Sequence, residues 1–363
     1  MSSLSAAHPL SGFGWNDDRA ADFAPLAEAG LTPARIARVD RGRCDVVVAD
    51  PGTGEVRTVR ADSRPVGDPD VLKNPCTGDW AAVDLSASPM PVVSALLPRG
   101  TAIVRKTSGK RSEGQLLAAN IDTVLIAVSL AADPDLGRIE RFLALAWESG
   151  AEPLVALTKA DLVDDAEFVR ADVEGIAPGV TVLVVSAETG EGIDVLRACT
   201  TGTTALIGQS GAGKSTLTNA LAGSEVMVVQ QVRSVDEKGR HTTTTRELIP
   251  LPGGGVVIDT PGLRGVGLYG GEGLAHAFSE IEELAADCRF DDCSHTSEPG
   301  CAVLAAREDG TLPERRWESY VKLQKESAWI ASRSDARLRA ERAKEWKNIT
   351  KSMRGANSPV RHR

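Results

Sequence analysis

The stretch TTALIGQSGAGKST at residues 203–216 constrains the fold of this chain more than any other. It predicts a short apolar strand, then a glycine-rich loop, then a helix, which is the setting in which the pattern GxxxxGKS binds phosphate. Glycines let backbone N–H groups turn toward an anion, and the helix N-terminus adds positive potential. Lys214 is placed to reach the terminal phosphates and Ser215 to hold Mg²⁺. The expected phosphate-contacting residues are Gly208, Gln209, Ser210, Gly211, Ala212, Gly213, Lys214, Ser215 and Thr216.

The length, apolar runs, N-terminus and charge of the chain limit the classes of protein to which it can belong. The 363 residues are enough for two or three domains, and no apolar run approaches about 20 residues, so we expect no membrane span. The N-terminus lacks a basic region followed by an apolar stretch, which predicts a cytoplasmic protein without a signal peptide. A net charge of −9 argues against a general nucleic-acid coat, although the chain is basic from Arg333 onward.

Five segments are expected along the chain. Residues 1–33 read as an extension. Residues 34–100 carry short strands separated by turns and predict a small β-barrel; an oligonucleotide-binding (OB-like) barrel and any other small β-domain fit this pattern equally. Residues 101–116 are basic and loop-like, and they fit a linker or a phosphate-contacting loop. Residues 117–275 alternate strands and helices, which predicts an α/β domain with a mainly parallel, doubly wound sheet. Residues 276–363 complete the chain.

Two motifs upstream of the glycine-rich loop predict recognition of guanine. The tetrapeptide TKAD begins at Thr158 and follows an expected strand. The Asp161 carboxylate can accept hydrogen bonds from both the N1–H and the exocyclic amine of guanine, a donor pair that adenine lacks. The Lys159 stem can cover the face of the base. After the next strand come Ser186 and Ala187, and the Ala187 backbone N–H can meet guanine O6.

A third motif, DTPG, follows a later strand and completes a nucleotide site. Its Asp259 can hold Mg²⁺ through water, and its Gly262 is expected near the γ-phosphate. Ordinary GTPases place the phosphate loop first and the base motifs last, whereas here the base motifs come first. The sequence therefore predicts a circularly permuted P-loop GTPase domain, in which the segment after Gly262 connects directly to the C-terminal region. A change at the γ-phosphate could then move that region.

The C-terminal region carries a dense group of metal-ligand residues. Cys288, Cys293, His295 and Cys301 lie within fourteen residues, a set that suits a tetrahedral, structural zinc site. Buried free cysteines with a surface histidine are the alternative. Helices are expected at about residues 313–326 and 333–351, so the region is interpreted as a zinc-binding, mainly helical domain with a basic tail.

The residue that orients the attacking water is not evident from the usual pattern. Many GTPases carry a Gln just after the DxxG motif, but this chain has Leu263 there, without a polar side-chain atom. The nearest candidate is His241, in the segment GRHTTTT, where Thr243 or Thr244 is expected to coordinate Mg²⁺. An exposed loop histidine without a role is the alternative.

These motifs together resemble the ribosome-small-subunit-dependent family of circularly permuted bacterial GTPases. The resemblance covers about residues 34–325. It is carried by LAANID beginning at Leu117, by the base motif, the glycine-rich loop, GRHTTT and DTPGLR, and by the cysteine cluster. One departure is Thr158, which stands where many GTPases have Asn; a Thr keeps only part of the tie between this loop and the phosphate loop.

The resemblance implies a fold, cofactors and a partner. The implied fold is a GTPase domain between an OB-like barrel and a zinc-binding helical domain. The implied cofactors are GTP or GDP, Mg²⁺ and Zn²⁺. It implies hydrolysis stimulated by the 30S subunit during its late maturation, with the barrel and the zinc domain on 16S ribosomal RNA; we expect a monomer and no membrane contact. Two alternatives remain: a P-loop ATPase, which Asp161 and Ala187 disfavour, and an RNA-binding assembly module that uses GTP only as a structural ligand.

Overall fold

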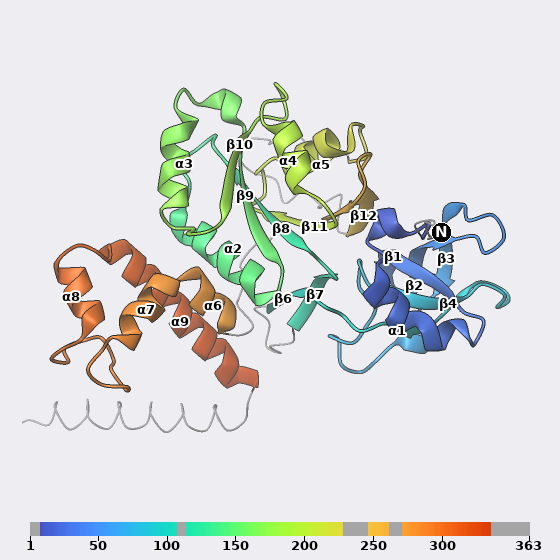
Figure 1. The fold of residues 1–363 in the computed structure, drawn as a ribbon, viewed down its shortest axis with the longest axis horizontal. Coiled ribbons are helices and arrows are strands. Elements are labelled where there is room, and N and C mark those ends of the chain that lie inside the picture. The colour runs from blue at the N-terminus through green and yellow to red at the C-terminus, as the bar shows by residue number, and fades with distance from the viewer. Residues whose placement is uncertain (1–7, 107–113, 228–245, 261–270, 335–363) are drawn as a thin grey trace, which may run out of the picture.

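The computed structural model describes residues 8–106, 114–227, 246–260 and 271–334, and every statement about structure below refers to them. The first strands close into a barrel (Figure 1). They are β1 (Thr32–Asp40), β2 (Arg43–Ala49), β3 (Val56–Asp62), β4 (Trp80–Asp84) and β5 (Val92–Leu96), with a 3-10 turn η2 (Arg64–Val66). They pair in the order β1-β2-β3-β5-β4, and β4 pairs back to β1. Alternate side chains such as Val46 and Val48 fill the interior, so the expected OB-like barrel is confirmed as a five-stranded barrel.

The residues before the barrel fold onto it, through η1 (Ser11–Phe13) and α1 (Asp17–Ala27). The side chain of Asn16 caps α1 by accepting a hydrogen bond from the backbone N–H of Arg19 at 3.0 Å. The Trp15 ring lies edge-on to Phe23 and to Trp80, with centroids 5.8 and 5.0 Å apart. This extension therefore packs outside the barrel interior, in the hydrophobic cluster that continues into the α/β domain.

A second set of strands forms the parallel sheet that the alternating pattern predicted. It consists of β10 (Thr181–Val185), β9 (Glu152–Thr158), β8 (Thr123–Ser129), β11 (Thr203–Gly208) and β13 (Val256–Asp259), with β12 (Glu247–Pro250) antiparallel beside β13. Helices α2 (Leu136–Glu148) and α3 (Ala166–Glu174) cover one face, and α4 (Ile193–Cys199) and α5 (Lys214–Ala222) cover the other (Figure 1). Neighbouring residues of one strand, such as Leu125 and Ile126, belong to different hydrophobic clusters, as two covered faces require.

The barrel and the parallel sheet are continuous. Arg38 of β1 pairs with Glu247 of β12, so eleven strands form one sheet. Beside this junction the buried Arg35 guanidinium donates hydrogen bonds of 3.0 Å to the Asn120 carbonyl oxygen and to the Thr203 hydroxyl. Burial lowers the pKa of Arg35 to about 9, although Asp122 and Asp79 act against that shift.

The segment expected as a linker, residues 101–116, instead contains strand β6 (Ala102–Lys106) and the start of β7 (Gly114–Ala119). The two strands pair antiparallel as a separate two-stranded sheet. Ile103 and Leu117 are buried in the main core, and their burial stabilises this hairpin. The residues between Ile103 and Leu117 are mostly charged or small, so no clear strand pattern is visible in the sequence there.

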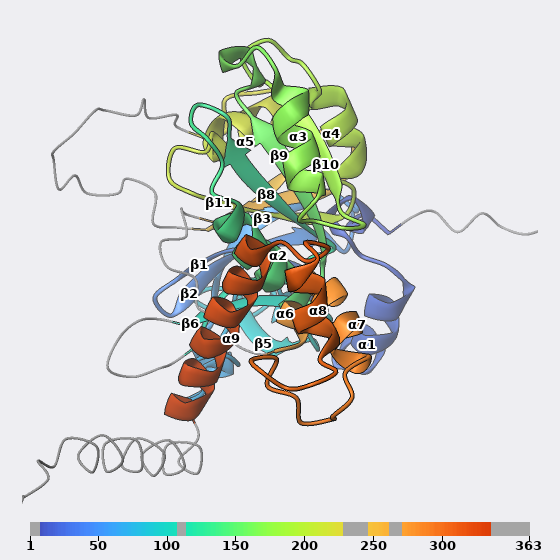
Figure 2. The same ribbon diagram turned by 90° about the vertical axis from the view of Figure 1, so that its left-hand side faces the viewer.

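Four helices follow the described end of the α/β domain: α6 (Glu272–Ala277), α7 (Ser279–Ala286), α8 (Ala302–Glu308) and α9 (Glu314–Ser334), seen together in Figure 2. Helix α6 lies directly on α2, because a Cβ at Gly273 would sit only 2.1 Å from the Ala144 carbonyl oxygen. Helix α9 continues past the expected helix at 313–326, while most of the helix expected at 333–351 falls outside the described residues. None of the helices in the described ranges combines the length and the apolar character needed to cross a membrane.

A buried carboxylate fixes these helices to the α/β domain. Glu140 of α2 has no exposed surface, and it accepts hydrogen bonds of 2.9 Å from Arg315 and Arg316 of α9 and a further one from the Ser319 hydroxyl. Arg316 also donates to Glu280 of α7. Glu140 and Arg316 are almost fully removed from water, whereas Arg315 and Glu280 are partly exposed, and each charge has a partner, as a buried ion pair needs.

Candidate nucleotide and metal sites

The glycine-rich loop joins β11 to α5, as the sequence predicted. Gly208 ends the strand so close to β8 that a Cβ there would lie 2.5 Å from the Ala127 carbonyl oxygen. Gly211 and Gly213 have φ angles of 81° and 78°, in the left-handed region that favours glycine. The loop therefore turns sharply into the first turn of α5, with Lys214 at its start. Gln209 and Ser210 are exposed, while Ser215 and Thr216 are half-buried.

Two opposite charges face each other at this loop. The Lys214 ammonium donates to the Gly208 and Gln209 carbonyl oxygens at 3.1 and 2.7 Å. Burial lowers its pKa, and the nearby Asp259 carboxylate acts in the opposite direction. Asp259 ends β13, where burial raises its pKa and Lys214 opposes that rise.

Asp259 is a fitting oxygen donor for Mg²⁺. Its Oδ1 is buried and has no hydrogen-bond partner among the described residues. A buried carboxylate oxygen without a partner is costly unless a cation or a water molecule satisfies it. Together with the half-buried Ser215 hydroxyl, it supplies the hard oxygen ligands that Mg²⁺ prefers.

The predicted base-reading residues meet at the ends of β9 and β10. Lys159 has a φ angle of 62°, and this left-handed residue turns the chain from β9 into the 3-10 turn η3 (Ala160–Leu162), which carries Asp161. The buried Ser186 hydroxyl donates to the Asp161 carboxylate at 2.5 Å. The Asp161 side chain is therefore held in one orientation by the residue that precedes Ala187.

A pocket of about 270 Å³ brings the base motifs and the glycine-rich loop together. Its lining residues are Thr158, Lys159, Asp161, Leu162, Ala187, Glu188, Gly213, Thr216 and Leu217. Three of them were not singled out in the sequence: Leu162, Glu188 and Leu217. Each directly follows a predicted residue, so the only sequence signal for them is adjacency to a motif.

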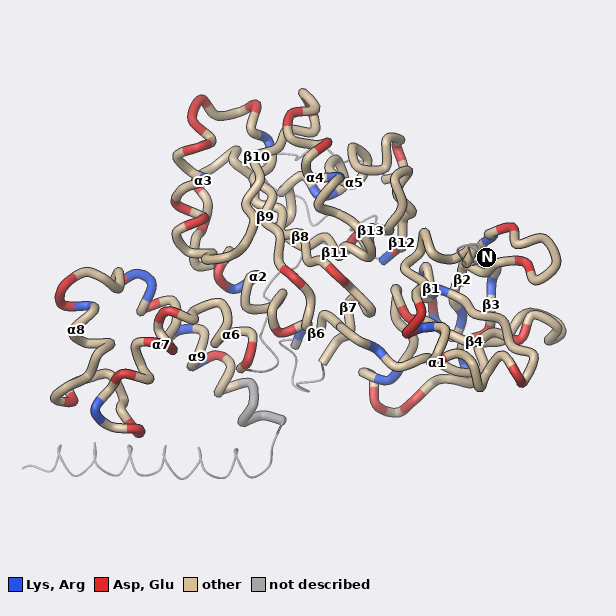
Figure 3. The backbone as a smooth tube through the Cα atoms, in the orientation of Figure 1, with Lys and Arg blue, Asp and Glu red and all other residues tan. Residues whose placement is uncertain are grey.

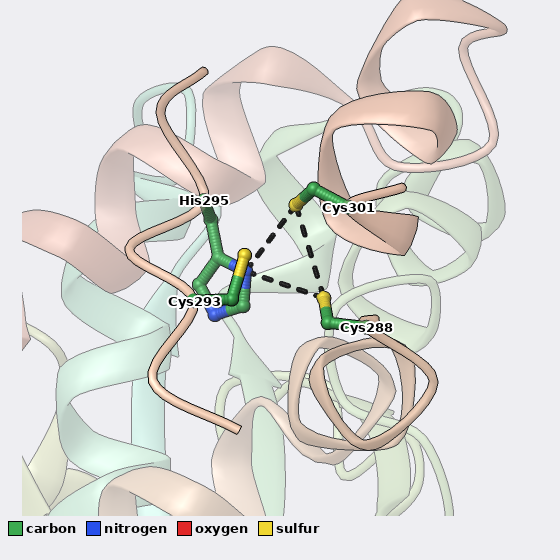
Figure 4. Close-up of side chains that lie close together, drawn as sticks. All are labelled: Cys288, Cys293, His295 and Cys301. Atoms are coloured by element: carbon green, nitrogen blue, oxygen red, sulfur yellow. Dashed lines mark hydrogen bonds between the residues drawn. The ribbon is translucent and has the colours of Figure 1, made fainter. Parts of the chain in front are cut away.

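Four ligand atoms in the C-terminal region converge, as Figure 4 shows. The sulfurs of Cys288, Cys293 and Cys301 and a ring nitrogen of His295 all lie within 4.8 Å of one another. The Cys288 and Cys301 sulfurs are 3.8 Å apart, and His295 Nδ1 is 3.6 and 3.4 Å from them. A tetrahedral zinc with Zn–S bonds of about 2.3 Å separates its sulfurs by about 3.8 Å. The four residues therefore fit a zinc ion.

The loop that presents these ligands is braced by Glu298. Its carboxylate accepts hydrogen bonds from the backbone N–H groups of Ser294, Thr296 and Ser297, each at 2.9 or 3.0 Å. The carboxylate also accepts a hydrogen bond from the Ser294 hydroxyl. This bond, followed by the three backbone bonds, holds the pKa of Glu298 well below its usual range. The His295 backbone has a φ of 56°, an uncommon conformation that this tight loop imposes.

Several predicted residues lie outside the described part of the chain. They are the candidate for orienting water, His241, the two candidate Mg²⁺ ligands Thr243 and Thr244, and the residues Gly262 and Leu263 of the DTPGL segment. Strand β12 begins three residues after Thr244, and β13 ends three residues before Gly262. Both segments thus connect to the described sheet beside Asp259.

Comparisons with known proteins agree with this arrangement. A sequence profile described as RsgA GTPase matches residues 96–269. The small ribosomal subunit biogenesis GTPase RsgA of Streptomyces coelicolor is 61% identical over 343 residues, 93% of this chain and 92% of that protein. The protein of the same name from Opitutus terrae is 43% identical over 360 residues, 95% of this chain and 97% of that one.

Solved structures give the same fold. YjeQ from Thermotoga maritima is 27% identical and has a TM-score of 0.60, with 82% of this chain and 98% of that chain covered. YloQ, described as a circularly permuted GTPase, is 22% identical with a TM-score of 0.57 over 82% of this chain and 95% of that chain, a likeness that concerns the fold alone.

Proposed function

Since this chain belongs to the RsgA GTPase family and is a GTP hydrolase, we propose that it hydrolyses GTP on the small ribosomal subunit during late assembly of that subunit. The family resemblance seen in the sequence is thereby confirmed. The observation that carries the proposal is the 61% identity, over 93% of the chain, to a protein named for small ribosomal subunit biogenesis. The pocket between the base motifs and the glycine-rich loop supports it from the structural side.

The loops after β9 and β10 form the wall of the pocket that binds guanine. Asp161, oriented by Ser186, accepts the two guanine donors, and the Ala187 N–H donates to guanine O6. The Lys159 stem lies along the base face. Phosphate is bound by the backbone of residues 208–216 and by Lys214, whose ammonium exchanges its present carbonyl partners for phosphate oxygens.

Two metal ions complete the site assignments. Mg²⁺, held by Ser215 and by Asp259 through water, would neutralise charge on the phosphates. Asp259 suits this role because one of its buried oxygens has no other partner among the described residues. Zinc, held by Cys288, Cys293, His295 and Cys301, would be structural, because four protein ligands leave no position open for a substrate.

The hydrolytic step depends on the segment before β12. There Thr243 or Thr244 would hold Mg²⁺, and His241 would hydrogen-bond the attacking water at the γ-phosphate. Gly262 contributes its backbone N–H near the same phosphate. Contact with the ribosome would position His241 for this role, so hydrolysis would rise when the partner is bound.

The partner is the 30S subunit, contacted through 16S ribosomal RNA by the barrel, the zinc-binding loop and the basic residues from Arg333 onward. Basic side chains supply the phosphate contacts, and the five-stranded barrel is an architecture that binds oligonucleotides. The protein acts as a monomer in the cytoplasm.

The test is steady-state turnover of GTP and of ATP, each with and without purified 30S subunits. The proposal requires GTP turnover that rises with 30S, little ATP turnover, and loss of both GTP rates in Lys214→Ala. Turnover that 30S leaves unchanged, with GTP still bound, would instead favour an RNA-assembly module that uses GTP as a structural ligand. Equal ATP turnover would favour a P-loop ATPase.

A further inference from the structure

Two large hydrophobic side chains stand out on the surface beside the nucleotide pocket. Phe168 is 67% exposed and Leu162 is 59% exposed, the two highest values for large hydrophobic residues among those the structure describes. Leu162 ends η3 and Phe168 lies in the first turn of α3. Both therefore lie on the segment that follows β9.

Phe168 lies on the solvent side of α3, whereas Leu162 also lines the nucleotide pocket. Helix α3 buries Val173 and half-buries Val169, one turn apart, against the α/β domain. Phe168 lies on the opposite face with Ala171 and Asp172, all three exposed. Burial of a Phe side chain is favourable, so Phe168 can still bury apolar surface against a partner.

This face is also strongly acidic. Residues 159–174, from the end of β9 through α3, contain six Asp and Glu residues but two Lys and Arg residues, so they carry −4 of the chain's −9 net charge. One of the two basic residues is engaged locally, because Arg170 pairs with Glu167 and Glu174. Figure 3 shows acidic residues around α3 with few basic ones.

We propose that the α3 face, defined as Leu162, Asp164, Phe168 and Asp172, docks a Lys- and Arg-rich protein segment that carries an apolar side chain. Acidic groups around an exposed phenyl ring complement such a segment and repel RNA phosphates. The inference rests on the proposed function in one respect: the segment belongs to a protein of the small ribosomal subunit. The α3 face then contacts ribosomal protein while other surfaces contact RNA.

A photocrosslinker placed on the full-length protein tests the partner class. Phe168 is replaced by p-benzoylphenylalanine, and Val71, an exposed residue of the barrel domain, is replaced likewise as a matched control. Irradiation of the 30S complex should crosslink position 168 to a basic segment of a ribosomal protein, identified by mass spectrometry. Crosslinks from position 168 to 16S RNA, to this chain's own residues 335–363, or to nothing in a bound complex would overturn the proposal.

Charge and shape are tested by the double variant Phe168→Ser/Asp172→Lys. It should bind 30S at least about tenfold more weakly, the scale of an interface anchor, while GTP turnover without 30S stays unchanged because neither residue lines the pocket. Val195→Ser/Glu191→Lys makes the same kind of change at exposed positions on and beside α4, to which no partner contact is assigned, and should bind like wild type. Equal affinity of the two double variants would contradict the proposal.

A probe without ribosomes separates this inference from the proposed function. A fluorescent peptide of alternating Lys and Leu should bind the wild type and the Val195→Ser/Glu191→Lys control with similar affinity. It should bind the Phe168→Ser/Asp172→Lys variant at least about tenfold more weakly. If the wild type fails to bind 30S but the variants still differ in peptide affinity, the proposed function is wrong and the docking face is supported. Loss of the difference would remove the docking face alone.

Discussion

The hydroxyl of Thr158 lies 2.8 Å from the carbonyl oxygen of Ala212, so the loop after β9 is hydrogen-bonded to the glycine-rich loop before α5. The same hydroxyl lies 3.2 Å from the Val128 carbonyl oxygen, and its single proton is shared between the two acceptors. The residues proposed to read the base and those proposed to hold the phosphates are therefore connected through one side chain. Thr preserves the tie at a position where many GTPases have Asn.

Removal of this tie should weaken nucleotide binding. Thr158→Val keeps the shape but loses the donor, and a hydrogen bond of this kind is worth about 1 kcal/mol, or about a fivefold change in affinity. Titration with fluorescent GDP measures the change. Thr158→Ser, which keeps the hydroxyl, should bind like wild type; a Thr158→Val protein with undiminished GDP affinity would show that the tie has no part in binding.

Base choice should follow the Asp161 carboxylate. Asp161→Asn replaces one acceptor oxygen by a donor, so guanine should bind poorly and xanthine, which carries a C2 carbonyl, should bind better. Competition between GDP and xanthosine diphosphate gives the preference directly. Asp164→Asn changes an exposed carboxylate three residues away that does not line the pocket, and it should keep the guanine preference. The same preference in both variants would rule out Asp161 as the base reader.

The zinc assignment predicts a coupled loss of metal and stability. Cys293→Ser should release the ion and lower the melting temperature by several degrees, because each kcal/mol lost shifts Tm by about 2–4 °C in domains of 150–250 residues. GDP affinity should stay close to that of wild type. Cys199→Ser, a cysteine outside the cluster, is the control. Elemental analysis is the primary measurement, and purified wild type without near-stoichiometric zinc would end the assignment.

The buried carboxylate of α2 should matter far more than an exposed one. Glu140→Ala removes the fully buried partner of Arg316, which keeps only the partly exposed Glu280, and should lower the free energy of unfolding by about 3–5 kcal/mol. Glu167→Ala removes one exposed ion pair with Arg170 and should cost at most about 1 kcal/mol. Urea unfolding followed by circular dichroism compares them. Equal losses in the two variants would mean that the Glu140 cluster contributes no more than surface charge.

Hydrolysis should depend on His241. In His241→Ala we expect near-normal GTP binding and loss of the rise in turnover on adding 30S subunits, because the water is no longer oriented. Thr242→Ala, in the same segment, serves as the control and should keep the stimulation. Full stimulation in His241→Ala would leave water positioning to a group on the ribosome.

The nucleotide motifs, apart from GRHTTTT, could be read from the sequence because each follows a strand. A strand followed by GxxxxGKS or TKAD fixes both the local turn and the edge of the sheet at which it lies, so Asp161 and Gly213 could be expected in one pocket. The cysteine cluster was equally accessible, since its ligand spacing is short.

Long-range contacts could not be read in this way. Nothing near Trp15 in the sequence indicates that its ring packs on Trp80, and nothing near Glu140 indicates Arg316, 176 residues later. The β6–β7 hairpin was missed for a related reason. Its two buried anchors, Ile103 and Leu117, are separated by a basic segment that favours a linker when read locally.

The pairing of Arg38 with Glu247 has a practical consequence for dissecting the molecule. Leu248 and Ile249 of β12 are buried, and β1 runs beside the start of that strand. Cutting the barrel away would leave a bare, apolar strand edge, which is a template for self-association. An isolated α/β fragment would therefore tend to aggregate, and its low activity would report lost solubility rather than a lost function of the barrel.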